Sequence, residues 1–254
     1  PFVEAAKGTD CRILASLTSH MDSDRLNEGT IETIRAEACN YWQQGIDGLY
    51  VNQWFGRWPY QGSFYEILRE VPHPDIMAPK DKIYHVPTET GRHPTGRLQP
   101  DLVPRLPVDL LEGKRASAEL MVSDDLPRWD RVGRVHEVIL RIRVIEATEL
   151  DQLCFRFNGK ELPSSLMRTI NQMYTMGSPR YRVWGYWFVF RLDREHWPVN
   201  GRNVIEVTLL KRDPDVTSQI YLRDVELEIK YLMGKNYHRD FVDTDLGPYE
   251  RVVE

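Results

Sequence analysis

An alternation of apolar and charged residues in the second half of the chain constrains the fold more than any other feature. In one stretch the apolar residues Val138, Leu140, Ile142 and Val144 alternate with Glu137, Arg141 and Arg143. In another, over residues 225–231, apolar residues alternate with glutamate and lysine. Successive side chains of a β-strand point to opposite faces of its sheet, so a period of two is typical of strands. We therefore expect two strands here, each with one buried face and one solvent-exposed face.

Turn residues divide this half of the chain into further strands. These are expected at 116–123, 152–157, 181–192 and 203–211. Asn158-Gly159 and Asn200-Gly201 are typical turn sequences between them. Six strands without a convincing helix predict an antiparallel, jelly-roll-like β-sandwich over residues 115–233.

Aromatic residues crowd one of the predicted strands. Alternation places Trp184, Tyr186, Phe188 and Phe190 on one face of this strand and Trp187 on the other. We assign the first face to the core. Trp187 either packs on the preceding part of the chain or stands in a ligand groove.

The first 85 residues have a different pattern, in which short apolar runs precede stretches with a 3.6-residue period. The predicted elements are strands at 13–18 and 48–52, a helix from Thr30 to about Gly45, and a helix at 63–71. This βαβα order is typical of α/β folds, but a complete (β/α)8 barrel takes about 250 residues. Residues 1–85 are therefore predicted to be a partial α/β segment, which makes the whole chain α+β.

A proline-rich stretch separates these two patterns. Prolines at 87, 94, 100, 104 and 107 indicate an extended linker over residues 86–114, because proline restricts its own backbone and that of the residue before it. Residues 234–254 form a polar C-terminal tail that is expected to wrap a surface or fray.

Composition excludes several classes of function. Apolar residues make up 41% and charged residues 28% of the chain, and no apolar run is long enough to span a membrane. The net charge of -5 argues against a nucleic-acid partner. Three cysteines, at 11, 39 and 154, are too few and too far apart for a disulfide framework or a zinc site. We expect no metal and no cofactor.

Polar residues follow the first predicted strand, at the end where α/β sheets and barrels place functional groups. Ser19, His20, Asp22 and Asp24 stand in this loop. The histidine and the two aspartates could serve in acid/base chemistry, as metal ligands or in sugar binding. Equally, Asp22 and Asp24 could simply form turns through hydrogen bonds to the loop backbone.

Amides and aromatic rings follow the second predicted strand. Asn52, Gln53, Trp54 and Trp58 suit a carbohydrate, whose hydroxyls need paired donors and acceptors and whose apolar ring faces stack on aromatic side chains. Alternatively, the tryptophans seal the interface with the sandwich. Glycoside hydrolysis normally needs two carboxylates, and no glutamate follows directly on either strand end.

Three segments together resemble a known arrangement. Residues 45–52 (GIDGLYVN), residues 80–84 (KDKIY) and a sandwich that contains residues 157–160 (FNGK) are similar to the C-terminal part of proteins identified as bacterial glycoside hydrolases. In that family a (β/α)8 barrel precedes a β-sandwich. The resemblance implies that strands 13–18 and 48–52 are the last two barrel strands. It also implies that Ser19, His20, Asn52 and Gln53 face the sugar.

Two hypotheses follow. In the first, the chain is the C-terminal portion of a glycoside-hydrolase-like, carbohydrate-active protein, and hydrolysis requires barrel strands from a longer polypeptide or another subunit. In the second, it is a non-catalytic carbohydrate-binding or assembly module. The expected partner is a carbohydrate in both cases, and action on a polysaccharide would imply an extracytoplasmic location.

Overall fold

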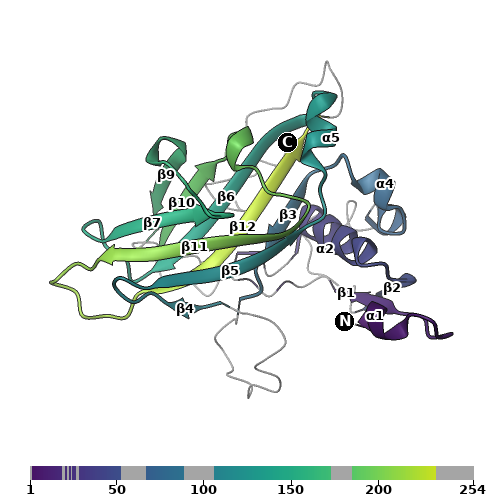
Figure 1. Ribbon diagram of the computed structural model, residues 1–254, viewed down its shortest axis with the longest axis horizontal. Coiled ribbons are helices and arrows are strands. Elements are labelled where there is room, and N and C mark those ends of the chain that lie inside the picture. The colour runs from purple at the N-terminus through teal and green to yellow at the C-terminus, as the bar shows by residue number, and fades with distance from the viewer. Residues whose placement is uncertain are drawn as a thin grey trace, which may run out of the picture.

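The computed structural model describes residues 2–18, 21, 23, 25–26, 29–52, 67–88, 106–172 and 185–232. Figure 1 shows a small α/β segment at one end of the molecule and two layers of antiparallel strands in the rest. The predicted α+β class and the sandwich-like arrangement of antiparallel sheets are confirmed.

The α/β segment is built around two parallel strands. Its elements are α1 (Phe2–Ala6), β1 (Leu14–Leu17), α2 (Ile31–Gln43), β2 (Gly48–Val51) and α4 (Pro74–Met77). Strand β1 pairs with β2 in parallel, with Leu14 opposite Gly48 and Leu17 opposite Val51. The strands predicted at 13–18 and 48–52 are therefore present. Residues 67–70 of the helix predicted at 63–71 are helical, and residues 63–66 lie outside the described ranges.

Helix α2 starts where the sequence predicts, because Thr30 caps its first turn. The Thr30 side chain accepts a hydrogen bond from the backbone N–H of Thr33, and the Thr33 hydroxyl accepts one from the backbone N–H of Thr30. This reciprocal capping satisfies two amides that have no partner inside the helix. Gly45, with φ of +82°, follows the C-terminal end. Ile34 and Ala38 on one face of the helix belong to a buried cluster with Leu17 of β1 and Ile83 (residues 82–85 form β3).

The larger sheet of the sandwich has strand order β3-β12-β6-β10-β9, with β4 also paired to β12. Its strands are β3 (Lys82–His85), β4 (Val108–Asp109), β6 (Val135–Ile145), β9 (Met167–Asn171), β10 (Tyr186–Arg191) and β12 (Tyr221–Tyr231). Strand β3 belongs to the range assigned by sequence to the α/β segment, yet it pairs antiparallel with β12. The part of the chain that follows the α/β segment therefore enters the sandwich as a strand of the large sheet.

The smaller sheet has strand order β5-β11-β7-β8. Its strands are β5 (Arg115–Val122), β7 (Gln152–Phe157), β8 (Lys160–Glu161) and β11 (Gly201–Lys211). The predicted turn at Asn158-Gly159 joins β7 to β8, with positive φ at both residues. Two single-turn 3₁₀ helices, Ser164–Leu166 and Arg194–His196, lie in connections of the sandwich.

The expectation that the sandwich contains no helix is wrong at α5 (Leu126–Arg131). The carboxylate of Asp125 accepts a hydrogen bond from the backbone N–H of Arg128 at 3.0 Å, and a proline occupies the first turn. Both features are standard signals of a helix start. The helix is short, so its 3.6-residue period is hard to detect in the sequence.

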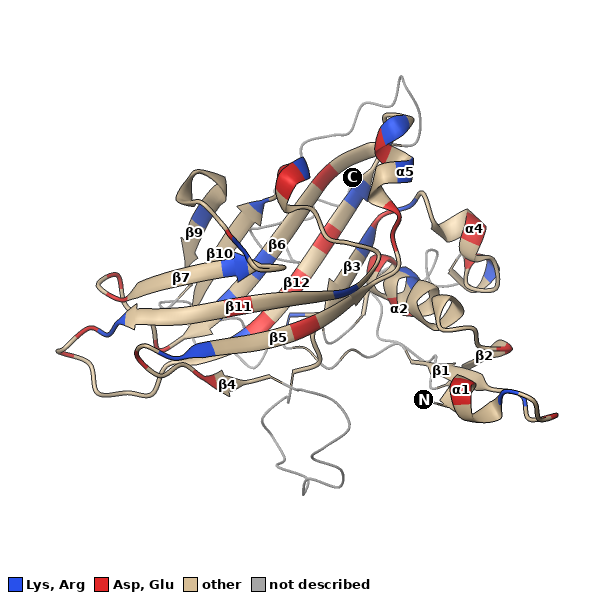
Figure 2. Ribbon diagram, in the orientation of Figure 1, with Lys and Arg blue, Asp and Glu red and all other residues tan. Residues whose placement is uncertain are grey.

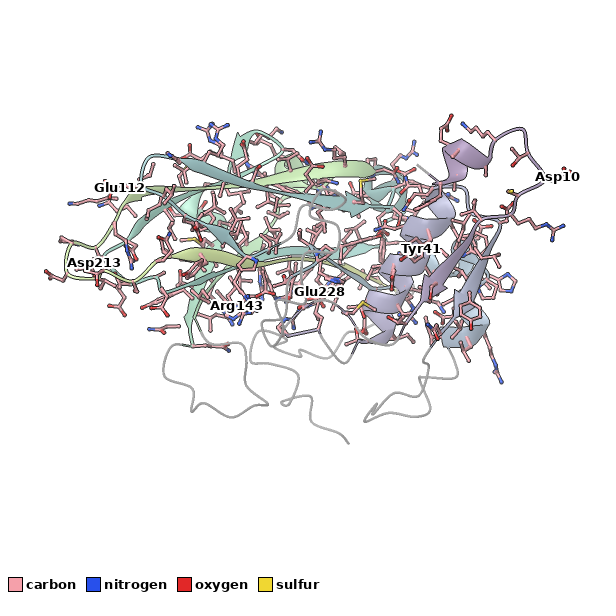
Figure 3. All side chains as sticks on the ribbon, turned by 90° about the horizontal axis from the view of Figure 1, so that it is seen from below. Asp10, Tyr41, Glu112, Arg143, Asp213 and Glu228 are labelled. Atoms are coloured by element: carbon pink, nitrogen blue, oxygen red, sulfur yellow. The ribbon has the colours of Figure 1, made fainter. Side chains whose placement is uncertain are left out.

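The main core lies between the two sheets. The alternate apolar residues of β6 and β12 face those of β5, β7 and β11 across it. The prediction for the aromatic strand holds for the described residues: Tyr186, Phe188 and Phe190 contact this core, whereas Trp187 is buried on the opposite face of the sheet. Figure 3 shows the two layers edge-on, with the α/β segment at one end.

A buried polar cluster joins β3 and β12 of the large sheet to the residue Asp124, which follows β5 of the small sheet. The Asp124 carboxylate accepts hydrogen bonds from Lys82 Nζ at 2.9 Å, from the Tyr231 hydroxyl at 2.5 Å and from the Tyr84 hydroxyl. Burial, followed by the charge of Asp124, raises the pKa of both tyrosines well above its usual value. Cys39 of α2 lies in the same region, and burial raises the pKa of its thiol to about 11.

The predicted solvent-exposed face of β6 and β12 is wrong, because both faces of these strands are buried. Arg141 and Arg143 on β6 are 3% and 1% exposed, and Glu226 and Glu228 on β12 are 0% and 5% exposed. Figure 2 shows acidic positions along β12 beside basic positions on β6. Ion pairs between these strands, and with a loop of the α/β segment, compensate the buried charges.

Candidate functional site

The parallel pairing of β1 and β2 brings together the two strand ends that the predicted ligand loops follow. The backbone N–H of Asn52 donates to the carbonyl of Leu17 at 2.9 Å, so the two strand ends lie side by side. Asn52 itself is exposed. The other predicted site residues, Ser19, His20, Asp22, Gln53, Trp54 and Trp58, lie outside the described residues, and their roles remain predictions.

Part of the loop that follows β1 is described, and its side chains point into the molecule. Met21, Ser23 and Leu26 are each 5% exposed or less. The backbone N–H of Ser23 donates to the carbonyl of Met21 at 2.8 Å, and that of Leu26 donates to the Ser23 hydroxyl at 3.2 Å. These bonds give the loop a compact form before α2 begins.

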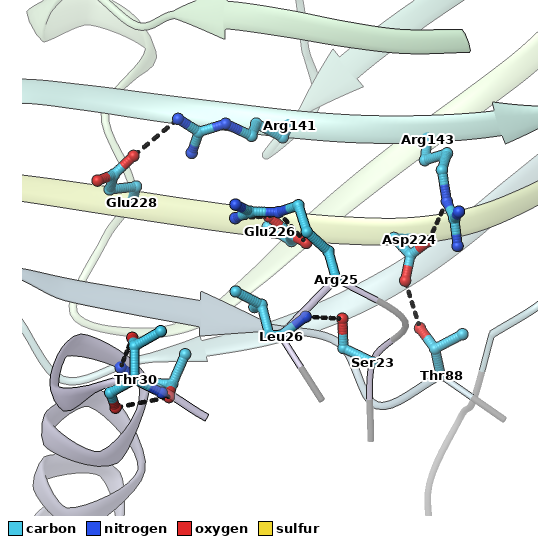
Figure 4. Close-up of polar contacts among 11 residues, drawn as sticks. Ser23, Arg25, Leu26, Thr30, Thr88, Arg141, Arg143, Asp224, Glu226 and Glu228 are labelled. Atoms are coloured by element: carbon cyan, nitrogen blue, oxygen red, sulfur yellow. Dashed lines mark hydrogen bonds and ion pairs between the residues drawn. The ribbon is translucent and has the colours of Figure 1, made fainter. Parts of the chain in front are cut away.

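Arg25 fixes this loop to the sandwich. Its guanidinium forms a fork around the Glu226 carboxylate, with Nε at 3.0 Å from Oε1 and 2.8 Å from Oε2, and with Nη2 also bonded to Oε2 (Figure 4). The Arg25 side chain is 15% exposed and that of Glu226 is fully buried. Two-pronged arginine–carboxylate pairs of this kind restrict orientation as well as distance.

Two further ion pairs lie on the same face of the large sheet, one on each side of Glu226 along β12. Arg141 Nη2 lies 2.7 Å from Glu228 Oε2, and Arg143 Nε donates to Asp224. The Thr88 hydroxyl lies 3.3 Å from Asp224 Oδ1. Figure 4 shows the three carboxylates in a row on β12, with the β6 arginines on one side and Arg25 reaching in from the loop.

Trp187 of β10 lies near two of these guanidinium groups. The Arg143 and Arg25 carbons lie 5.4 Å and 6.0 Å from the centre of its ring. Cation–π attraction of this kind is strongest where water is excluded, and Trp187 is only 4% exposed. Trp187 is thus buried against the large sheet, and Arg25 is its contact with the loop of the α/β segment.

Burial and neighbouring positive charges act in opposite directions on the pKa of Glu228. Burial by itself raises the pKa of Glu228, but the positive charges of Arg141 and Lys230 outweigh it, so the pKa lies below its usual value. A general acid at neutral pH needs a raised pKa instead. Glu228 therefore serves as a structural anion, and Glu226 and Asp224 are likewise engaged by arginines.

Sequence reasoning missed this arrangement, although part of its signal was present. The outward positions of β6 carry arginines and those of β12 carry acids, and the antiparallel register places Arg141 opposite Glu226 and Arg143 opposite Asp224. Complementary charges on two strands indicate neighbours in a sheet. The contribution of Arg25 has no such local signal.

A shallow pocket of about 230 Å³ lies on this face at the β9 edge. Arg168, Val189, Arg191 and Ser165 are among its lining residues. It is separated from Glu226 by β10 and β6 in the strand order, and one of its guanidiniums, that of Arg191, lies 3.5 Å from Glu137. It is therefore distinct from the two strand ends.

No three histidine, cysteine, aspartate or glutamate side chains of the described residues gather closely enough to hold a metal ion. None of the helices described here combines the length and the hydropathy that crossing a membrane would require. Comparison of the chain with models of known protein families and with curated proteins gives no match.

Proposed function

We propose that this chain is the C-terminal portion of a carbohydrate-active, glycoside-hydrolase-like protein. In this proposal β1 and β2 are two neighbouring strands of an α/β barrel, and hydrolysis requires the remaining strands, supplied by a longer polypeptide or by another subunit. The observation that carries the proposal is the uncovered face of the β1–β2 pair.

One face of this pair packs on α2 and the other is open. Leu17 is fully buried and, with Val51, belongs to the core beneath α2. On the opposite face Leu14 is 59% exposed and Tyr50 is 58% exposed. Parallel strands are normally buried on both faces. In a barrel, helices cover the outer face and side chains of the other strands fill the interior, so the open face fits the interior side of a barrel wall.

The position of the two loops is consistent with this proposal. Both leave from the carboxyl ends of adjacent parallel strands, which is where barrel enzymes bind substrate. The resemblance to glycoside hydrolases would make Ser19, His20, Asn52 and Gln53 sugar-facing residues. The described acids near these ends are engaged by arginine, as Glu226 is, so the catalytic carboxylates would come from the other strands.

The alternative, a carbohydrate-binding or assembly module, would need a binding platform on the sandwich or on the aromatic loop. The outer face of the small sheet carries the ion pair of Arg115 with Glu206 at 2.8 Å and that of Arg202 with Glu119. Its described strands present no aromatic ring on that face. On the outer face of the large sheet, Glu226 is occupied by its ion pair with Arg25, and Trp187 is buried. Neither face supports the alternative as well as the open β1–β2 face supports the barrel.

The size of the native protein tests the proposal directly. We expect the native polypeptide to exceed the 29.8 kDa of this chain and to carry further α/β strands, or the chain to purify with a second subunit that carries them. Intact mass spectrometry and light scattering on protein from its natural source measure this. A native chain that begins at Pro1 and has no partner would rule out hydrolysis as described.

Sugar binding by the aromatic loop is tested with Trp54→Ala and Trp58→Ala. Each substitution is expected to weaken retention on columns of cellulose, xylan or chitin by about two- to tenfold, the size of a lost stacking interaction. Phe2→Ala removes an aromatic ring that is 78% exposed and remote in sequence, and should leave retention unchanged. If both tryptophan variants melt early and keep normal retention, the rings seal an interface instead.

A further inference from the structure

The outer face of the large sheet contains two glutamates in nearly identical settings. Glu226 and Glu228 are alternate residues of β12, both are at least 95% buried, and each is paired with an arginine. They differ in the origin of that arginine. Arg141, the partner of Glu228, belongs to the neighbouring strand β6, whereas Arg25, the partner of Glu226, belongs to the loop between β1 and α2.

This difference gives the two ion pairs different mechanical roles. The Arg141–Glu228 pair links two strands that backbone hydrogen bonds already hold together. The Arg25–Glu226 pair spans 201 residues of sequence and joins a loop to a sheet. Since Glu226 is fully buried, leaving it without a cation would be costly, and the loop must keep Arg25 in place.

Contacts of Arg25 with Trp187, and of its neighbour Leu26 within the loop, further restrict the position of Arg25. Its guanidinium carbon lies 6.0 Å from the ring centre of Trp187, and its neighbour Leu26 is 4% exposed and bonded through its N–H to Ser23. The loop is thus held at two consecutive residues. Arg25 pairs with Glu226 and contacts Trp187, and the side chain of Leu26 is buried. Ser19, His20 and Asp22, the predicted sugar-facing residues, lie three to six positions before Arg25.

We propose that Glu226 is a positioning residue for the loop between β1 and α2, acting through Arg25. The role of the loop in ligand binding rests on the proposed function. The positioning by Glu226 does not.

Hydrogen exchange followed by mass spectrometry tests the positioning, with Glu226→Gln compared with the matched control Glu228→Gln. The peptide that contains Ser23, Leu26 and Gly29 reports on the loop, because all three amides donate hydrogen bonds within it. We expect Glu226→Gln to speed exchange in this peptide by about tenfold or more, and Glu228→Gln to change it by less than about twofold. Equal acceleration in both variants, or none in Glu226→Gln, would overturn the proposal.

A milder variant covers the case in which Glu226→Gln fails to fold. Arg25→Lys keeps the positive charge but loses the planar fork, so the loop should exchange several-fold faster while the melting temperature stays close to that of the original protein. A purely structural role would instead move the melting temperature and the loop exchange together. That result would contradict the positioning role.

Retention on the same polysaccharide columns separates this inference from the proposed function. If Glu226→Gln loosens the loop and lowers retention while Glu228→Gln does neither, both proposals are supported. If the loop loosens selectively but the unmodified protein is not retained, the positioning stands and sugar binding fails. If retention is normal in every variant and the loop is unchanged in Glu226→Gln, the positioning fails and sugar binding stands.

Discussion

Replacing Asp124 by asparagine is expected to lower the free energy of unfolding by about 3–5 kcal/mol, the cost of breaking a buried ion pair from one side. The Asp124 side chain is 1% exposed and so is that of Lys82, its partner at 2.9 Å. Lys82 Nζ also donates to the carbonyls of Ala78 and Lys80, but these neutral groups do not balance its charge. The amide of asparagine also accepts hydrogen bonds at only one of its two terminal atoms, so one of the two bonds that the tyrosine hydroxyls now donate to Asp124 is lost or reversed.

Urea unfolding at pH 7 measures this loss, and Asp125→Asn is the matched control. Asp125 is the next residue, is exposed, and caps α5. Asparagine is as good an N-cap as aspartate, so this variant should unfold almost like the original protein. A loss of less than about 1 kcal/mol in Asp124→Asn would mean that the cluster is hydrated, and that it does not stabilise the link between Asp124 and the large sheet.

Elements whose signals are local could be predicted from the sequence. Helix α2 has a capping threonine and a terminal glycine within one continuous stretch, and β1 and β2 are short apolar runs on either side of it. The strands of the sandwich follow from their period of two, which does not depend on the rest of the fold. Their pairing order is a tertiary property, and sequence reasoning did not propose one.

The environment of a strand could not be predicted where distant residues determine it. The alternation in β6 and β12 is the same whether the charged face meets water or another part of the protein. The pattern therefore predicts that Arg141 and Arg143 face solvent, although both are buried. The charge of the buried Glu226 is compensated by Arg25, which precedes it by 201 residues.

The candidate site likewise has a part that the sequence predicts and a part that it does not. The strand ends that carry Asn52 and the loop after β1 were located correctly, because strand positions and parallel order follow from the βαβ pattern. Glu226 was missed because an acidic residue at an alternating strand position is usually solvent-exposed. A functional interpretation of the loop that ignores the sandwich would therefore omit the residue that holds it.

Arg143→Met tests whether the outer face of the large sheet is as dry as the burial of its charges indicates. The Arg143 and Asp224 side chains are 1% and 2% exposed, and Thr88 adds a hydrogen bond to the same carboxylate at 3.3 Å. Methionine fills much of the space of the arginine stem but leaves Asp224 without this cation. We expect a loss of about 3–5 kcal/mol in the free energy of unfolding, as for other buried pairs broken from one side.

Arg202→Met on the small sheet is the control, because it breaks an arginine–carboxylate pair that is 63% and 43% exposed. Solvent screens such a pair, so its loss should not change the unfolding midpoint measurably. Raising the salt concentration should likewise leave the difference between Arg143→Met and the original protein unchanged, since buried charges are screened little. If the two substitutions cost the same, or if salt removes the effect at Arg143, water reaches the face beneath the β1–α2 loop. The large sheet would then be a hydrated surface, and a single ion pair to Glu226 could not hold the loop in one position.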